Sequence, residues 1–263
     1  MKKLLFNGCS FVAGDDIGWD YKTIGNPWDS KNSEAWIQHR EDRKKFNLGA
    51  VCARILNTKS IDISEDGASN SHIALKTIKY LHKLSYEEKS KIHVCIGWTE
   101  PTRFIHYVEQ IHSFYNVGLA MFKSKHPWID TIKEKYPKEL NQYVDTVIRY
   151  KNDETFMIEY LSNILLLENF LMVHNITYTF WRSLGKEFSD NDKYIASHMF
   201  DLNALTNHSH WVTGNTNDST PIMSKSWLRY DDLAYNSIYL TQSHHPSSLA
   251  ITYLSEKIRK KLE

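Results

Sequence analysis

The chain of 263 residues is 41% hydrophobic and 13% aromatic, which is enough apolar material for the core of a single α/β domain over residues 1–263. Its formal net charge of +1 gives no case for nucleic acid or an anionic membrane as a partner. Cys9, Cys52 and Cys95 form no CxxC pair, so we expect reduced, buried thiols rather than a disulfide framework or a zinc site.

The N-terminus superficially resembles a secretion signal, because two lysines precede the apolar run Leu4–Phe6. That run is far shorter than the roughly 7–15 apolar residues of a signal sequence. No segment approaches the roughly 18 apolar residues of a membrane span. We therefore expect a soluble, cytoplasmic protein without a membrane partner.

The first predicted element is a buried strand over residues 4–7, which ends in Gly8, Cys9 and Ser10. Residues 8–14 are expected to form the turn at its carboxyl end, which is the edge where open α/β sheets bind ligands. A serine there lies near the backbone N–H groups of the next helix, a placement that suits a nucleophile. On this segment alone, Ser10 can equally be an ordinary helix N-cap.

A helix over residues 46–56, ended by Asn57, precedes a second strand over residues 60–64. The strand leads into a loop that contains Gly67 and Asn70, and another helix follows. Because a glycine lets the backbone come close to a substrate oxygen, the N–H of Gly67 is a candidate donor. Asn70 is either a side-chain donor or the cap of the helix.

The third predicted strand covers residues 91–98, and its exit loop begins with Thr99 and Glu100. Thr99 can donate one hydrogen bond through its hydroxyl group. Arg103 is a candidate for binding an anionic group of a substrate, with a surface salt bridge as the alternative. Trp98 is a further candidate for contact with a substrate at this edge.

Residues 104–152 are longer than a minimal connection in such a fold and are rich in Tyr, His, Lys and Phe. We predict an inserted, mostly helical cap over the site, with an oligomer contact as the alternative. His106, His112 and His126 lack the helical pairing of metal ligands, so no metal site is predicted.

A long helix over residues 154–173 leads to a fourth strand over residues 175–181. Helices and strands alternate along the chain, which favours a parallel sheet with helices on both faces. The expected fold is a three-layer α/β/α sandwich, similar in plan to flavodoxin, with a mainly parallel sheet of about five strands. The last strand is expected to be short, near residues 237–240.

The terminal helix is expected to begin near residue 242 and to end near Lys261, with His244, His245 and Pro246 at its start. Proline is typical of the first helical turn, so this segment can be a helix start signal alone. In the alternative interpretation, His245 is a general base and His244 contacts the substrate beside it.

Four short segments resemble, in the same order, the sequence blocks of the SGNH (GDSL-type) hydrolases. Residues 8–11, Gly-Cys-Ser-Phe, resemble the Gly-Asp-Ser-Leu block that carries the nucleophile, in a form similar to a divergent branch seen in bacterial and phage proteins. Gly67 stands at the family's oxyanion glycine, and Thr99 stands at the asparagine of its Gly-x-Asn-Asp block. His245 stands at the family's general base.

The resemblance implies a serine esterase with Ser10 as its nucleophile and with no metal or cofactor. Its substrate would be a small-molecule or glycan ester, an O-acetyl group on a sugar being one candidate. An acyltransferase, a hydrolase of nucleotide phosphoesters and a non-catalytic binding protein on the same scaffold are the alternatives.

The chain also departs from the family's pattern. With a threonine in place of the asparagine, either Thr99 or Asn70 supplies the third oxyanion donor, or the site is weakened; losing one donor costs about 10²–10³ in rate. Gln242 replaces the acid of the family's Asp-x-x-His block. Asp231, Asp232 or a backbone carbonyl can orient the imidazole instead, and a Ser–His dyad also stays open.

Overall fold

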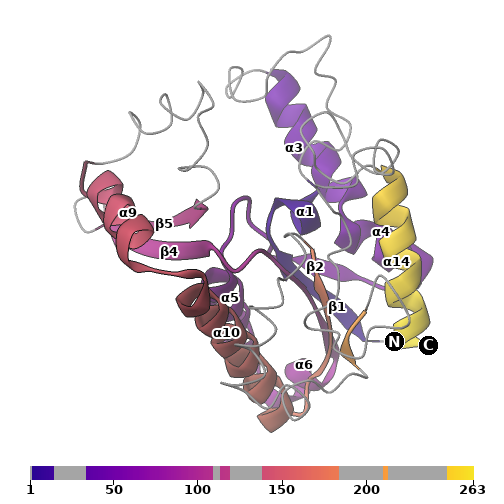
Figure 1. The fold of residues 1–263 in the computed structure, drawn as a ribbon. Coiled ribbons are helices and arrows are strands. Elements are labelled where there is room, and N and C mark those ends of the chain that lie inside the picture. The colour runs from indigo at the N-terminus through magenta and orange to yellow at the C-terminus, as the bar shows by residue number, and fades with distance from the viewer. Residues whose placement is uncertain (1, 15–33, 109–112, 119–137, 184–209, 213–247) are drawn as a thin grey trace.

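The computed structural model describes residues 2–14, 34–108, 113–118, 138–183, 210–212 and 248–263 (Figure 1). A four-stranded parallel sheet with the strand order β2-β1-β3-β6 forms its centre. The strands are β1 (Lys3–Gly8), β2 (Ser60–Asp62), β3 (Ile92–Trp98) and β6 (Thr177–Arg182). These are the four strands predicted first along the sequence, and their parallel pairing brings their carboxyl ends to one edge.

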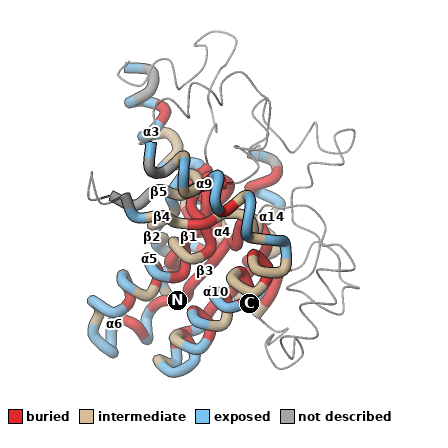
Figure 2. Tube along the Cα trace, turned by 60° about the vertical axis from the view of Figure 1, so that its left-hand side comes forward, coloured by how far each residue is buried: buried red, intermediate tan, exposed pale blue. Residues whose placement is uncertain are grey.

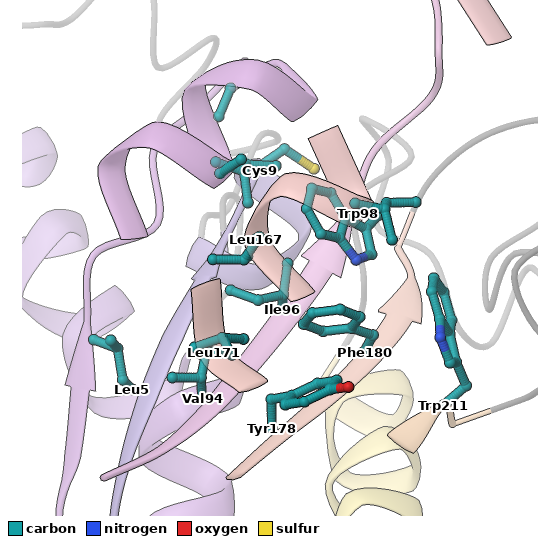
Figure 3. Packing of buried hydrophobic residues seen from close by; sticks show 14 of the residues in the cluster. Leu5, Cys9, Val94, Ile96, Trp98, Leu167, Leu171, Tyr178, Phe180 and Trp211 are labelled. Atoms are coloured by element: carbon teal, nitrogen blue, oxygen red, sulfur yellow. The ribbon is translucent and has the colours of Figure 1, made fainter. Parts of the chain in front are cut away.

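Helices cover both faces of this sheet, because successive strand residues point in opposite directions. One face packs against α5 (Asn70–His82) and α10 (Asp153–Val173), and the other packs against α4 (Leu48–Ile55) and α14 (Ser248–Leu262). The strand side chains in the first core include Leu5, Val94, Ile96, Trp98, Tyr178 and Phe180 (Figure 3). Those in the second core are Leu4, Phe6, Cys95 and Trp181. The predicted three-layer α/β/α sandwich is confirmed, with its buried residues along the strands (Figure 2).

The helix predicted over residues 46–56 is found as α4, which begins at Leu48 because Phe46 is the last residue of the preceding helix α3 (Glu34–Phe46). Asn47 is the N-cap, and its side chain accepts a hydrogen bond from the Ala50 N–H at 2.8 Å. At the other end Asn57 adopts a left-handed conformation with φ 48, and the Thr58 N–H donates to the Ala53 carbonyl at 2.9 Å. Asn57 is therefore the helix stop that its position predicts.

The insertion after β3 differs from its prediction. It begins with an antiparallel hairpin of β4 (Arg103–Val108) and β5 (Ser113–Gly118), and the helix α9 (Lys138–Tyr150) follows. Phe104 and Val117 are direct cross-strand partners, and both are buried against apolar side chains of α9 and α10. This apolar pair stabilises a hairpin that was not predicted, beside a helix of the predicted kind. Whether the whole segment is mostly helical stays a prediction, because residues 109–112 and 119–137 lie outside the described residues. The role of residues 104–152 as a cap or an oligomer contact stays a prediction.

Several smaller elements were not predicted. The short helix α6 (Tyr86–Ser90) precedes β3 and begins with a capping box between Ser85 and Glu88. Trp211 pairs with Phe180 beyond β6, and the Val212 N–H donates to the Phe180 carbonyl at 2.8 Å. The strand predicted near residues 237–240 lies outside the described residues.

Among the described residues, α10 is the one helix with the length and apolar composition of a membrane span. Its 21 residues include Glu159 and Glu168, which interrupt the apolar run. The helix lies against α5 (Figure 1), and many of its side chains belong to the apolar core on that face of the sheet. These are the contacts of a helix packed within an α/β fold.

One buried histidine makes the stability of this fold sensitive to acid. His93 in β3 lies between two hydroxyl groups, Thr177 Oγ1 at 2.9 Å from Nδ1 and Thr179 Oγ1 at 2.9 Å from Nε2. Burial lowers the pKa of His93 from 6.5 to about 4, since the charged imidazolium loses its hydration there. The imidazole is therefore neutral in the folded chain at pH 7.

Because the unfolded chain takes up this proton at a higher pH than the folded chain, the contribution of His93 to stability is complete above about pH 6.5 and falls as the pH approaches 4. The loss corresponds to about 3 kcal/mol of unfolding free energy. Urea unfolding at several pH values should show a flatter profile for His93→Gln than for the wild type. His82→Gln, at an exposed position, is the control and should keep the wild-type slope. Parallel profiles for wild type and His93→Gln would contradict this assignment.

Candidate active site

Ser10 lies directly beyond the carboxyl end of the central strand β1. It is the first residue of the short helix α1 (Ser10–Ala13), and Cys9 is the N-cap, so the alternative interpretation of Ser10 as an N-cap is wrong. The Cys9 carbonyl accepts hydrogen bonds from the N–H groups of Val12 at 2.9 Å and Ala13 at 3.1 Å. Gly14 ends the turn in a left-handed conformation with φ 75. This tight turn holds Ser10 at the edge of the sheet.

Two glycines allow α1 to approach the strands this closely. Gly8 and Gly97 are register partners on β1 and β3. A Cβ atom at Gly8 would collide with Val12 Cγ2 and lie 2.9 Å from the Gly97 carbonyl oxygen. A Cβ atom at Gly97 would collide with Ser183 Oγ and meet Val12 Cγ2. The segment around Ser10 therefore fits only because both positions lack a side chain.

The loop that contains Gly67 runs alongside this turn. After β2 ends, the Ile63 N–H donates to the Phe6 carbonyl at 2.9 Å and the Glu65 N–H donates to the Gly8 carbonyl at 3.1 Å. A hydrogen bond from the Ala68 N–H to the Glu65 carbonyl, 3.1 Å, then closes a turn over residues 65–68. These contacts bring the Gly67 turn to the end of β1, next to the start of α1.

Gly67 itself is half-buried and has a backbone conformation that suits a glycine. Its φ of 74 is left-handed, which favours glycine, and a Cβ atom there would meet nothing within 4 Å. Within the described part of the chain, the Gly67 N–H has no hydrogen-bond acceptor. An N–H without an acceptor among the described residues is a candidate donor to a substrate oxygen.

Asn70 does not cap the following helix, which was one of its two predicted roles. Ser69 is the N-cap of α5 and accepts from the His72 N–H at 3.3 Å, so the interpretation of Asn70 as the cap is wrong. The Asn70 side chain is buried, accepts from the Thr99 N–H at 2.9 Å and donates to the Glu100 carbonyl at 3.0 Å. Its amide therefore holds the exit loop of β3, and its role as a substrate donor stays a prediction.

The Thr99 side chain points into the protein beside the Cys9 thiol. Its hydroxyl is buried and has no oxygen or nitrogen partner among the described residues. Burial raises the pKa of the Cys9 thiol, and the nearby Arg103 charge and the Thr99 hydroxyl offset this only in part. Cys9 is therefore a protonated thiol that fills space beneath the turn. All three cysteines are free and buried, as predicted.

The two remaining candidates near this edge, Arg103 and Trp98, have structural contacts. Arg103 Nε donates to Glu100 Oε1 at 3.0 Å, the salt bridge that was its alternative role. Trp98 is fully buried in the core, where its ring meets Phe180 edge-on at 5.5 Å (Figure 3). Binding of substrate by Trp98 stays a prediction, and its burial in the core is unfavourable for such a contact.

The predicted base lies outside the described residues, as do His244, Gln242, Asp231 and Asp232. The described part of the terminal helix begins at Ser248, three positions after His245 in the sequence. Ala250 belongs to the same core as Cys9 and Phe11, which flank Ser10. The start of α14 is thus packed into the core that also surrounds the Ser10 turn.

Sequence reasoning missed Asn7, the residue that fixes the end of β1. Its side chain is buried, donates to the Ile73 carbonyl at 3.0 Å and to Thr77 Oγ1 at 2.9 Å, and accepts from the Gly8 N–H at 2.8 Å. An amide at the end of an apolar run, directly before the glycine, is the signal that could have identified it. These bonds tie β1 to α5 just before the Ser10 turn.

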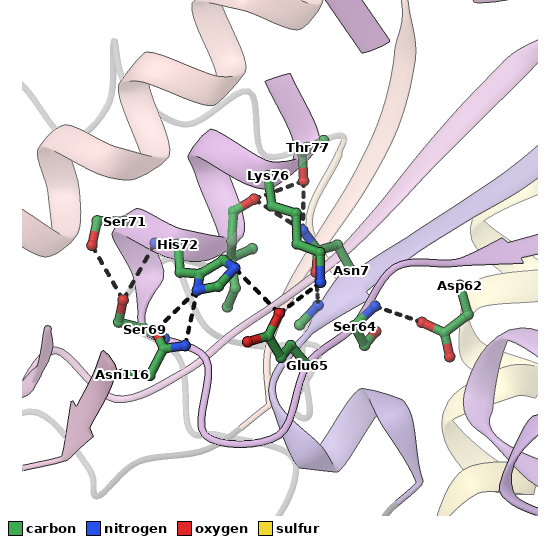
Figure 4. A network of polar contacts seen from close by, with 12 residues as sticks. Asn7, Asp62, Ser64, Glu65, Ser69, Ser71, His72, Lys76, Thr77 and Asn116 are labelled. Atoms are coloured by element: carbon green, nitrogen blue, oxygen red, sulfur yellow. Dashed lines mark hydrogen bonds and ion pairs between the residues drawn. The ribbon is translucent and has the colours of Figure 1, made fainter. Parts of the chain in front are cut away.

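A second group that was missed is the polar network around the Gly67 turn, which includes Glu65, His72, Lys76 and Asn116 (Figure 4). No group of three or more histidine, cysteine or acidic side chains within the described ranges is arranged to hold a metal ion. The polar residues at this edge are linked to one another and to the backbone.

No family model and no curated protein matches the sequence. Solved structures similar to the chain include a psychrotrophic esterase from Pseudoalteromonas sp. (10% identity, 100% of this chain and 97% of that chain covered, TM-score 0.47). A member of the lipolytic protein G-D-S-L family from Veillonella parvula is also similar (9% identity, 98% and 96% covered, TM-score 0.45). An acetyl xylan esterase from Butyrivibrio proteoclasticus is another (12% identity, 99% and 64% covered, TM-score 0.43). At these identities no residue role transfers from those proteins to this chain.

Proposed function

We propose that the protein is an SGNH-type serine hydrolase that cleaves esters, with Ser10 as the nucleophile and His245 as the general base. The observation that carries the proposal is the pairing of the Glu65 N–H with the Gly8 carbonyl at 3.1 Å. It brings the Gly67 turn, whose Gly67 N–H has no acceptor among the described residues, next to the turn with Ser10. A hydroxyl nucleophile and an oxyanion donor must share one edge in such a reaction.

In the proposed reaction, the Ser10 hydroxyl attacks the carbonyl carbon of the ester and its proton passes to His245. The negative charge that develops on the carbonyl oxygen is stabilised by backbone N–H groups, those of Gly67 and Ser10. The intermediate expels the alcohol, which takes the proton from His245. Water then attacks the acyl-serine with the help of the same base, and the acid is released.

The third oxyanion donor is the weakest part of this site. The Asn70 amide already forms hydrogen bonds with the Thr99 N–H and the Glu100 carbonyl. The Thr99 hydroxyl faces the Cys9 thiol. We therefore propose that the reaction relies on two backbone donors. A site with one donor fewer is slower by about 10²–10³, so we expect turnover slower than that of a hydrolase with the full set.

The proposed substrate is a small-molecule or glycan ester, an O-acetyl group on a sugar in particular. The acetyl xylan esterase among the similar structures acts on such a group, by its name. A short acyl group also suits a nucleophile that is largely buried. This assignment names a class of substrate rather than one compound.

The test is an assay of purified protein on a panel of acetyl and longer acyl esters, including O-acetylated sugars, with and without added alcohols. We expect release of acetate that follows the amount of enzyme and falls with longer acyl chains. Transfer of the acyl group to the alcohol in preference to water would indicate an acyltransferase. Cleavage of nucleotide phosphoesters alone, or no turnover of any ester, would contradict the proposal and favour the other scaffold functions.

A further inference from the structure

Polar side chains from three separate elements hold the turn that contains Gly67. Arg43 of α3 (Glu34–Phe46) binds both carboxylate oxygens of Asp66, at 2.9 and 2.7 Å. Lys76 of α5 contacts Glu65 at 2.8 Å. The third contact comes from the inserted hairpin, where Asn116 of β5 reaches the backbone N–H of Ser69. The conformation of this turn therefore depends on side chains outside it.

The Asn116 amide has a defined orientation (Figure 4). Its Oδ1 accepts from the Ser69 N–H at 3.0 Å, which leaves Nδ2 as the donor to His72 Nδ1 at 2.8 Å, while Nδ1 also lies 3.2 Å from Oδ1. With Nδ1 as an acceptor, the ring proton of His72 lies on Nε2, which faces Glu65 Oε2 at 3.4 Å. One amide thus connects β5 to both ends of the Gly67 turn, Ser69 directly and Glu65 through His72.

The contact with Ser69 is one that the backbone cannot replace. Ser69 is the N-cap residue of α5 and is fully buried, so its N–H precedes the helix and has no acceptor within it. A buried N–H that loses its partner costs about 1–3 kcal/mol, which favours a shift of the turn toward another acceptor. The hairpin itself is anchored elsewhere, through Phe104 and Val117 in the apolar cluster with α9.

We propose that Asn116 is a positioning residue that ties the inserted hairpin to the Gly67 turn, so that the hairpin holds the oxyanion donor in place. Its role in the reaction rests on the proposed function, whereas the link between hairpin and turn does not. A substrate that contacts the hairpin would therefore influence the position of the Gly67 N–H through the Asn116 amide.

The test compares Asn116→Leu, which has a similar size and no polar atom, with Asn116→Asp, which keeps an acceptor for the Ser69 N–H. Hydrogen exchange of peptides covering residues 63–72 and the kcat and KM of ester hydrolysis are measured together. We expect Asn116→Leu to speed exchange in this turn and to lower kcat, each by about tenfold, with KM changed less than about twofold. Asn116→Asp should show an exchange rate in this turn and a kcat that are both close to the wild-type values.

Asn163→Leu is the matched control, because within the described ranges its amide bonds only the Glu159 carbonyl of its own helix α10, at 2.6 Å. If Asn116→Leu does not fold, Asn116→Ser, whose side chain is too short to reach both partners, replaces it. Unchanged exchange in residues 63–72 would overturn the link whatever the esterase activity. Faster exchange with unchanged kcat in an active enzyme would overturn the positioning role. Faster exchange in a protein that hydrolyses no ester would support the link and reject the proposed function.

Discussion

Replacement of Ser10 by alanine is expected to lower kcat for ester hydrolysis by about 10⁴–10⁶, because no other group in the proposed mechanism can form the acyl intermediate. The residual rate would come from substrate binding and the backbone donors alone. The turn should persist, since backbone hydrogen bonds to the Cys9 and Ser10 carbonyls hold it and these are unchanged by the substitution. Steady-state kinetics on the best ester of the panel measures the effect.

Ser90→Ala is the matched control for this substitution. Ser90 is exposed at the end of α6, before β3 and therefore at the opposite edge of the sheet from Ser10. The kcat of the Ser90→Ala variant should equal that of the wild type within about twofold, as expected of a surface substitution. If Ser10→Ala loses less than tenfold while circular dichroism shows an intact fold, another residue is the nucleophile.

The largest expected effect on stability comes from Gly8→Ala. The added Cβ would collide with Val12 Cγ2 and meet the Gly97 carbonyl oxygen, which belongs to the neighbouring strand and cannot rotate away. Either β1 and β3 separate or α1 moves off the sheet, at a cost of about 3 kcal/mol in unfolding free energy. Urea unfolding monitored by tryptophan fluorescence measures this loss.

Gly67→Ala is the comparison for Gly8→Ala, because it introduces backbone strain without a steric collision. The position has a left-handed φ of 74 but open space around a new Cβ, so only the strain of about 1 kcal/mol is expected. Equal destabilisation by Gly8→Ala and Gly67→Ala would mean that the contact between α1 and the strands is looser than the structure indicates.

Much of the fold could be predicted from the sequence because its signals are local. Each strand of the central sheet is a short apolar or β-branched run, and the long helices have apolar residues that cover a continuous face. Asn57 ends α4 through its own backbone conformation, so a single residue was enough to predict the boundary. The alternation of helix and strand then left few arrangements other than a parallel sandwich.

The hairpin β4–β5 could not be predicted in the same way. Its stability comes from Phe104 and Val117 packed against α9, a helix that lies far along the chain. Asn116 joins residues 44 positions away, and Arg43 joins Asp66 across 23 positions. The sequence shows these residues as ordinary polar side chains, because their partners are chosen by the tertiary fold.

The candidate site was predicted in part. Ser10 and Gly67 lie on neighbouring turns at the carboxyl edge, and the hydrogen bond between Glu65 and Gly8 explains why. Asn70 contacts the backbone at Glu100, and Arg103 forms a salt bridge with the Glu100 side chain, while their roles toward a substrate stay predictions. Such contacts depend on the path of the β3 exit loop, which no local pattern specifies.

The most direct test of the central claim is a peptide map after treatment of the protein with a serine-directed fluorophosphonate. The account predicts one phosphonyl adduct, on the peptide that contains Ser10, absent in Ser10→Ala and slower to form in His245→Ala. An adduct on a different residue, or no adduct on a protein that hydrolyses an ester, would contradict it.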